Sequence, residues 1–208
     1  AGFIDYVEWA LDVPMYFVKR GKTYHDLTGV PFRRFWKEGA NGLRATVGDF
    51  ALHLSTLFPE VRLKQYLELR MVDSQPPESM LALSAIAKGV LYEPDCMLGA
   101  WDLVKDWSFE ERVRLNAAVH KGALATPVRK YRVQDLAREL IDIAEEGLRR
   151  QNCRDARGET EAIYLERARD DARRGRCPAE LVLERWNAGK RDAAGLVELT
   201  AYRLPAAA

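Results

Sequence analysis

The sequence lacks the marks of several classes of protein. No apolar run approaches the roughly 20 residues that a helix needs to cross a bilayer, and the first residues lack the basic and apolar segments of a signal peptide. We therefore expect a cytoplasmic protein without a membrane partner. Cysteine is scarce, and Cys96, Cys153 and Cys177 include no close pair, which argues against a disulfide framework and against a zinc site.

The chain also lacks an excess of charge of either sign. Its 32 basic and 31 acidic residues nearly cancel, so no electrostatic attraction to nucleic acid is expected. Arginines are dense between residues 149 and 176, but acidic residues lie among them, which is typical of solvated helix faces. The histidines are far apart, and none lies at metal-ligand spacing from a cysteine or an acidic pair. Any partner must therefore bind at a local site.

A phosphate-binding loop is absent as well, although Gly21, Lys22 and Thr23 suggest one. That motif needs another glycine five residues before Gly21, and Tyr16 occupies the position. Runs rich in β-branched and aromatic residues precede and follow Gly21, so we predict a hairpin with this glycine in its turn. Residues 3–11 fit either a short helix or the approach to a strand.

Local signals predict further elements up to residue 93. Pro31 and Gly39 bound a short helix. Thr46 and Asp49 form a capping box for the next helix, which Pro59 ends. A helix over residues 78–92 is apolar nearly all round, so we expect it to be buried on several sides.

From Pro94 onward the sequence predicts helices and no strand. The clearest helix has apolar residues every three or four positions between Val133 and Leu148. The other predicted helices cover residues 97–107, a segment capped by Ser108 and Glu111, residues 159–174, and a segment opened by Pro178. We expect the alanine-rich end after Pro205 to fray.

The most distinctive stretch runs from Phe58 to Asp73, which we interpret as one strand. Alternation places one set of polar residues on the same face, namely Arg62, Lys64, Tyr66, Glu68 and Arg70. Leucines and Met71 form the other face. Two interpretations of the charged face stay open. Either Glu68 holds Mg²⁺ while Arg70 binds the phosphate oxygens that the metal also contacts, or the charges form a cross-strand ladder of ion pairs in solvent.

Several segments are distinctive, namely residues 10–18 (ALDVPMYFV), 53–64 (HLSTLFPEVRLK), 66–70 (YLELR), 89–92 (GVLY) and 100–107 (AWDLVKDW). Together they resemble the glutamate–cysteine ligase family of the plant and proteobacterial type. The resemblance covers the carboxy-terminal half of a family member, and the chain starts at Ala1 instead of Met. We therefore expect a fragment, inactive alone, whose missing partner is the amino-terminal half of the same protein.

The resemblance implies an α+β fold, part of a glutamine-synthetase-like antiparallel sheet followed by a helical region. Residues 1–93 would form the carboxy-terminal part of the catalytic core, and residues 94–208 would pack on it. The implied reaction joins the γ-carboxylate of L-glutamate to the amine of L-cysteine through an acylphosphate, with ATP and Mg²⁺, as the first step of glutathione synthesis. The alternatives are a paralogous ligase with another amine and a non-catalytic helical interaction module.

The resemblance also implies roles for individual residues. By position, Glu68 corresponds to a Mg²⁺ ligand and Arg70 to a catalytic residue that contacts phosphate, with Arg62 and Lys64 as further ATP contacts. Tyr16 corresponds to part of the pocket that receives cysteine. Residues 71–75 (MVDSQ) depart from the Gly-Ala-Asp-Gly-Gly run common in the family, which leaves the amine substrate open. Without the rest of its sheet, we expect the chain to expose an apolar face or to self-associate.

Overall fold

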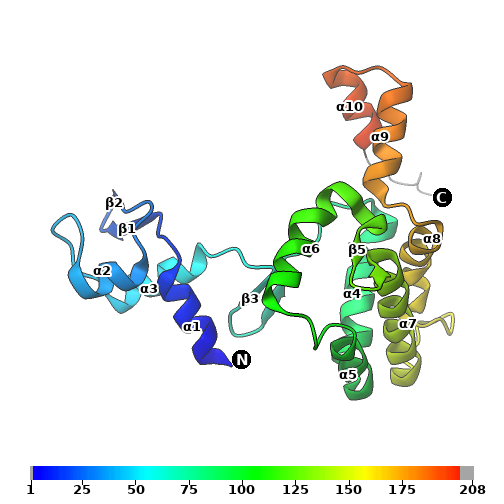
Figure 1. Ribbon diagram of the computed structural model, residues 1–208, viewed down its shortest axis with the longest axis horizontal. Coiled ribbons are helices and arrows are strands. Elements are labelled where there is room, and N and C mark those ends of the chain that lie inside the picture. Colours follow the sequence, from blue (N-terminus) through cyan, green and yellow to red (C-terminus); the bar gives the residue numbers. More distant parts are fainter. Residues whose placement is uncertain (1, 202–208) are drawn as a thin grey trace. The chain divides into compact units, whose positions relative to one another are not determined.

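The computed structural model describes residues 2–201, apart from the side chains of Pro77 and Glu78. The chain divides into two compact units, Ala1–Val72 and Asp73–Ala208. Helices and short antiparallel hairpins make up both units, which confirms the predicted α+β class in its coarse form (Figure 1). The predicted frayed end after Pro205 lies outside the described residues. Within residues 2–201, no helix combines the length and the apolar character needed to cross a membrane.

The first unit combines helices with two-stranded hairpins. Its helices are α1 (Phe3–Asp12), α2 (Phe32–Glu38) and α3 (Val47–Ser55), and its strands are β1 (Phe17–Arg20), β2 (Thr23–Asp26), β3 (Val61–Leu63) and β4 (Leu67–Leu69). The predicted hairpin around Gly21 is confirmed, with this glycine at φ +59°. The segment 3–11, which the sequence left open, is helical. The core consists of Leu11, Met15, Val18, Leu27, Phe32 and Phe35.

Helix α3 begins where its capping box predicts. The Thr46 hydroxyl accepts a hydrogen bond from the Asp49 backbone N–H, and the Asp49 carboxylate accepts one from the Thr46 backbone N–H. The same carboxylate is buried and accepts two hydrogen bonds from Arg20, at 2.5 and 2.7 Å. These bonds, chiefly from Arg20, lower the pKa of Asp49. One side chain therefore starts α3 and ties it to strand β1.

The prediction of a single strand from Phe58 to Asp73 is wrong. The stretch folds back into the β3–β4 hairpin, in which Arg62 pairs with Glu68 and Leu63 pairs with Leu67. Residues 64–66 (KQY) make the bend without glycine, proline or asparagine, so the usual turn signals are missing. Cross-strand partners point to the same face. Because this register pairs even-numbered residues with even-numbered ones, the predicted charged face survives the change of fold.

The second unit is mainly helical. Its elements in chain order are α4 (Pro77–Leu91), α5 (Pro94–Asp102), α6 (Phe109–Gly122), the 3₁₀ turn Ala123–Ala125, β5 (Pro127–Val128), β6 (Tyr131–Arg132), α7 (Val133–Gln151), the 3₁₀ segment Glu161–Leu165, α8 (Glu166–Arg174), α9 (Pro178–Ala188) and α10 (Ala193–Thr200). The apolar period between Val133 and Leu148 and the capping box of Ser108 and Glu111 are confirmed. The core of this unit includes Ala85, Val90, Ile141, Ala144, Leu148 and Leu165.

Helices α4 and α7 pack side by side (Figure 1), and two glycines lie at their contact. A Cβ atom added to Gly147 would lie 1.9 Å from the Gly89 carbonyl oxygen, and one added to Gly89 would lie 2.1 Å from the Ala144 carbonyl oxygen. The backbones are therefore in direct contact, with no room for a side chain between them.

Three predictions for this region need correction. Helix α4 is buried on several sides only in its second half, where residues 85–90 are all buried or half-buried, whereas Leu81 in its first half is 47% exposed. The helix predicted over 97–107 begins earlier, at Pro94, because proline suits the first helical turn, and it ends at Asp102. The β5–β6 hairpin contradicts the expectation of no strand after Pro94, and its two-residue strands are too short to give a periodic signal.

The predicted domain boundary between residues 93 and 94 does not coincide with the border of the compact units. Helix α4 packs with the helices that follow it, and these form one unit from Asp73. The division into a catalytic core and a helical region stays a prediction about the whole protein.

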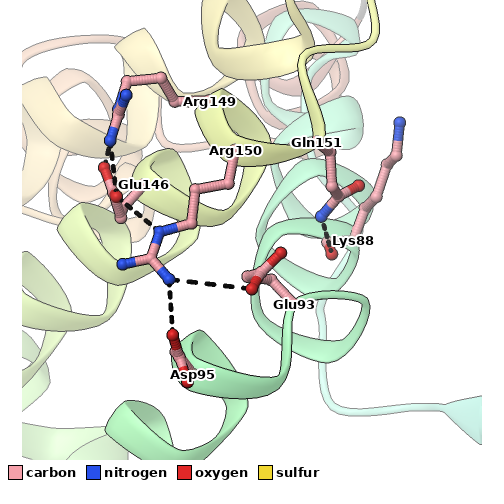
Figure 2. Close-up of polar contacts among 7 residues, drawn as sticks. All are labelled: Lys88, Glu93, Asp95, Glu146, Arg149, Arg150 and Gln151. Atoms are coloured by element: carbon pink, nitrogen blue, oxygen red, sulfur yellow. Dashed lines mark hydrogen bonds and ion pairs between the residues drawn. The ribbon is translucent and has the colours of Figure 1, made fainter.

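Arg150 fastens the end of α7 to the start of α5 (Figure 2). Its Nε donates to Glu146 one turn earlier at 2.7 Å, and its Nη1 donates to Asp95 at 2.8 Å and lies 3.8 Å from Glu93. Nearby, the Gln151 side-chain amide donates to the Lys88 carbonyl at 3.2 Å. A cation in the last turn of one helix thus meets acidic residues at the first turn of another, as both helix dipoles favour.

Candidate functional site

The charged face of the β3–β4 hairpin centres on the Glu68 carboxylate. Its Oε1 accepts a hydrogen bond from Arg70 at 2.7 Å, and its Oε2 accepts one from Arg62 at 2.9 Å. The Lys64 ammonium lies 3.4 Å from Oε2. These partners, chiefly Arg62, lower the pKa of Glu68 to about 2. Glu68 is therefore an anion at neutral pH, surrounded by three cations.

Arg62 differs from the other two cations because it is almost fully buried, with 7% of its surface exposed. Its Nη1 donates to the backbone carbonyls of Ser55 and Leu57, at 3.0 and 3.3 Å, just where α3 ends. Lys64 and Arg70 keep more of their side chains in solvent. Arg62 thus braces the hairpin, whereas Lys64 and Arg70 can turn toward a ligand.

The Phe58 ring supports the cation cluster. The guanidinium carbon of Arg70 lies 5.1 Å from the ring centroid, and that of Arg62 lies 5.9 Å away. Both distances fit a cation–π contact. The bend at residues 64–66 makes this arrangement possible, since it returns Arg70 to the start of the hairpin, where its backbone N–H donates to the Glu60 carbonyl at 2.8 Å.

Phe58 also lines a groove of about 460 Å³ in the first unit. Trp9 from α1 and Tyr16 from the segment before β1 contribute further aromatic rings to it. The Tyr16 side chain is 53% exposed. The remaining lining residues are Val13, Pro14, Thr56, Leu57, Pro59 and Glu60. A mainly apolar groove therefore adjoins a cluster of cations, with one phenylalanine ring belonging to both.

All the residues predicted from the sequence lie in these two features. Arg62, Lys64, Glu68 and Arg70 form the cation cluster, and Tyr16 lines the groove. Sequence reasoning missed Trp9, Phe58 and Glu60. Phe58 and Glu60 lie inside the segment chosen for its alternation, but only the fold-back of the hairpin gives them a place in the site.

A divalent metal ion could use only part of this cluster. Among the described residues, no group of three or more histidine, cysteine or acidic side chains could hold a metal ion. Mg²⁺, however, commonly binds one or two carboxylates together with substrate phosphates and water. The ionised Glu68 carboxylate fits the role of one such ligand, and phosphate oxygens would fit the surrounding cations.

Comparison with known proteins extends the argument beyond geometry. Residues 1–199 match the model of glutamate–cysteine ligase family 2. The chain belongs to this family. Among curated family members, glutamate–cysteine ligase from Solanum lycopersicum, named as chloroplastic, is 40% identical over 189 residues, which are 89% of this chain and 35% of the relative. The chloroplastic enzyme A from Oryza sativa subsp. indica is 42% identical over 185 residues, or 88% of this chain and 36% of the relative.

Glutamate–cysteine ligase from Arabidopsis thaliana, also named as chloroplastic, is 40% identical over 189 residues. The chain thus spans about a third of the length of the curated family members that it matches. Membership in glutamate–cysteine ligase family 2 confirms the resemblance that the segments between residues 10 and 107 indicated.

Proposed function

We propose that this chain is the carboxy-terminal portion of a glutamate–cysteine ligase. The proposed enzyme uses ATP to join the γ-carboxylate of L-glutamate to the amine of L-cysteine, the first step of glutathione synthesis. Family membership and the names of the relatives support the reaction class. The observation that carries the proposal is the Phe58 ring, which joins a cluster of three cations to an aromatic groove. A ligase of this kind must bind phosphate groups and must also receive an amine substrate. The cation cluster would suit the first task and the aromatic groove the second.

In the proposed reaction, a γ-carboxylate oxygen attacks the terminal phosphorus of ATP, and ADP leaves. The transferring phosphoryl group carries its negative charge on its outer oxygens. Arg70 would act as the catalytic residue at these oxygens, and Lys64 would contact ATP. The sequence also suggested Arg62 as an ATP contact, but its burial and its bonds to Glu68 and to the carbonyls at the end of α3 favour a bracing role instead. The cations of Arg70 and Lys64 are held in place before the charge develops, which is the main source of electrostatic stabilisation in enzymes.

Glu68 would hold Mg²⁺ together with phosphate oxygens. Bound Mg²⁺ would neutralise phosphate charge. Glu68 is suited to this task because the depressed pKa, about 2, keeps its carboxylate ionised. It also sets the positions of the cations, since Arg62 and Arg70 each donate to one of its oxygens.

Tyr16 and the groove would receive cysteine. Its amine nitrogen then attacks the acyl carbon of the γ-glutamyl phosphate, phosphate leaves, and the proton of the amine passes to solvent. The contact between the Phe58 ring and Arg70 would bring the incoming nitrogen close to the cations that hold the departing phosphate.

The remaining proposals concern the whole protein. The edges of the β1–β2 and β3–β4 hairpins would join a larger glutamine-synthetase-like antiparallel sheet with strands from the missing amino-terminal part, as an unpaired strand edge favours. Residues 1–93 would complete the catalytic core. We propose a cytoplasmic location for the enzyme.

The test is to express the full-length gene product and to measure glutamate-dependent release of ADP with cysteine and with a panel of other amines. We expect cysteine-dependent release and γ-glutamylcysteine as the product. Release that another amine supports and cysteine does not would replace the proposal with a paralogous glutamate–amine ligase. No release with any amine would favour a non-catalytic module.

A further inference from the structure

Glu60 lies at the border of the groove and the cation cluster, yet it forms no ion pair within the described part of the chain. It lines the groove and is exposed. Among residues 2–201 as the structure describes them, its carboxylate has no hydrogen-bonding or ion-pairing partner. Glu68 engages the guanidinium groups of Arg62 and Arg70 instead. The hairpin therefore places the Glu60 carboxylate, which has no cationic partner among the described residues, beside a cluster of three cations.

The surroundings of Glu60 favour a cationic ligand of a specific kind. The groove that it lines also carries the side chains of Trp9, Tyr16 and Phe58. Aromatic faces attract cations through the ring quadrupole, and a carboxylate adds a charge-assisted hydrogen bond. This combination recognises a primary ammonium group carried on a small, partly apolar body.

We infer that Glu60 binds the ammonium group of the amine substrate in this groove. The inference rests on the proposed function and adds a residue that determines which substrates the groove accepts. The fold makes the position useful, because the Glu60 carbonyl accepts the Arg70 N–H at 2.8 Å. An amine nitrogen at Glu60 is thus held next to the residue that contacts the phosphate, and it attacks after losing its proton to solvent.

Glu60→Gln in the full-length protein tests this role. The substitution keeps the length of the side chain and the backbone hydrogen bond to Arg70, so thermal unfolding should be unchanged. Loss of one charge-assisted hydrogen bond should raise the KM for cysteine about 10- to 100-fold. The KM values for glutamate and ATP should stay within about twofold. The kcat at saturating cysteine should also stay within about twofold, because the attacking nitrogen keeps N–H groups that donate to Glu60 and regains positive charge as it bonds to the acyl carbon, so the contact persists in the transition state.

Two control variants and a cysteine analogue without an amine show whether the effect comes from the charge of Glu60. Glu60→Asp keeps the charge and should restore part of the affinity for cysteine. Glu38→Gln removes an exposed carboxylate at the end of α2, paired with Arg34 and outside the groove lining, and should leave every constant unchanged. 3-Mercaptopropionate is cysteine without its amine. It should compete with cysteine no less well in Glu60→Gln than in the wild type, because it has no ammonium group to lose.

The outcomes separate this inference from the proposed function. A cysteine KM within twofold of the wild-type value, with γ-glutamylcysteine still formed, would overturn the inference and leave the function standing. A parallel rise in the KM values of all three substrates would also overturn it, because that pattern marks general damage to the site. If the wild-type protein forms no γ-glutamyl product with any amine, the proposed function fails and the inference fails with it.

Discussion

Arg62 and Glu68 face each other across the β3–β4 hairpin, with the guanidinium Nε 2.9 Å from Oε2. This pair holds the other cations in reach, since Arg70 and Lys64 approach the same carboxylate. It also explains why two interpretations of the sequence were possible. The ladder of ion pairs is present in the structure, and the same ladder arranges the groups that phosphate and Mg²⁺ would need.

The first prediction concerns turnover. Glu68→Gln and Arg70→Ala in the full-length protein should each lower kcat by about 100-fold or more, because each removes a preorganised charge at the transferring phosphate. ADP release measures this, and circular dichroism should show that thermal unfolding stays cooperative. Arg34→Ala on the surface of α2 is the control and should keep normal activity. Wild-type rates in either variant would refute the site assignment.

The second prediction concerns pH and the pair of Glu111 and Arg129. Two hydrogen bonds from Arg129, at 2.8 and 2.9 Å, are the main reason that the pKa of Glu111 falls from 4.5 to about 2. A carboxyl group whose pKa is lower in the folded state than in the unfolded state stabilises the fold at pH values above its unfolded-state pKa. That contribution is lost as pH falls from about 4.5 to about 2.

Glu111→Gln tests this, because glutamine can still complete the capping box with Ser108. The variant should have a lower Tm than the wild type at pH 7, and the difference should shrink to nothing near pH 2. Melting curves across this range give the result. A difference in Tm that stays constant with pH would contradict the role of the ion pair.

The third prediction concerns the contact of α4 with α7. Gly147→Ala should destabilise the chain by about 1–3 kcal/mol or more, because a Cβ 1.9 Å from the Gly89 carbonyl forces two backbones apart. Gly99→Ala is the matched control. Its Cβ would lie 3.7 Å from Ile143, an ordinary contact, so it should gain about 0.5–1 kcal/mol from better helix propensity. Urea unfolding measures both, and equal effects would count against the close packing.

The fourth prediction concerns association of the isolated chain. Leu67 on β4 is 60% exposed and Met71 just after it is 53% exposed, on a hairpin with open edges. We expect the chain to self-associate through this apolar face, and Leu67→Lys to reduce the association. Sedimentation velocity over a range of concentrations measures it. A wild-type chain that stays monomeric throughout would show that the face does not associate.

Signals that act within a few residues predicted the fold best. Thr46 and Ser108 start helices because each cap needs only three further residues, and α7 follows from its apolar period. The fold-back of β3–β4 was missed because its bend, Lys64-Gln65-Tyr66, has no residue that favours a turn. Contacts with residues distant in sequence, such as those between Arg62 and the end of α3, decide that bend.

The candidate site, like the fold, was predictable only where local patterns determine it. Alternation alone placed Arg62, Glu68 and Arg70 on one face, and the register of the hairpin preserves it. Phe58 and Glu60 were missed because their roles depend on the return of Arg70 to the start of the hairpin. No local pattern encodes that return.

Arg62 belongs to two structures at once, the hairpin and the end of α3, through its bonds to Glu68, Ser55 and Leu57. A hairpin with three-residue strands is too short to persist alone in water. We therefore expect its backbone amides to be protected from deuterium exchange only while the last turn of α3 is formed. The two segments should open as one cooperative unit, so that the arrangement of charges in the site depends on a helix end that contributes no side chain to it.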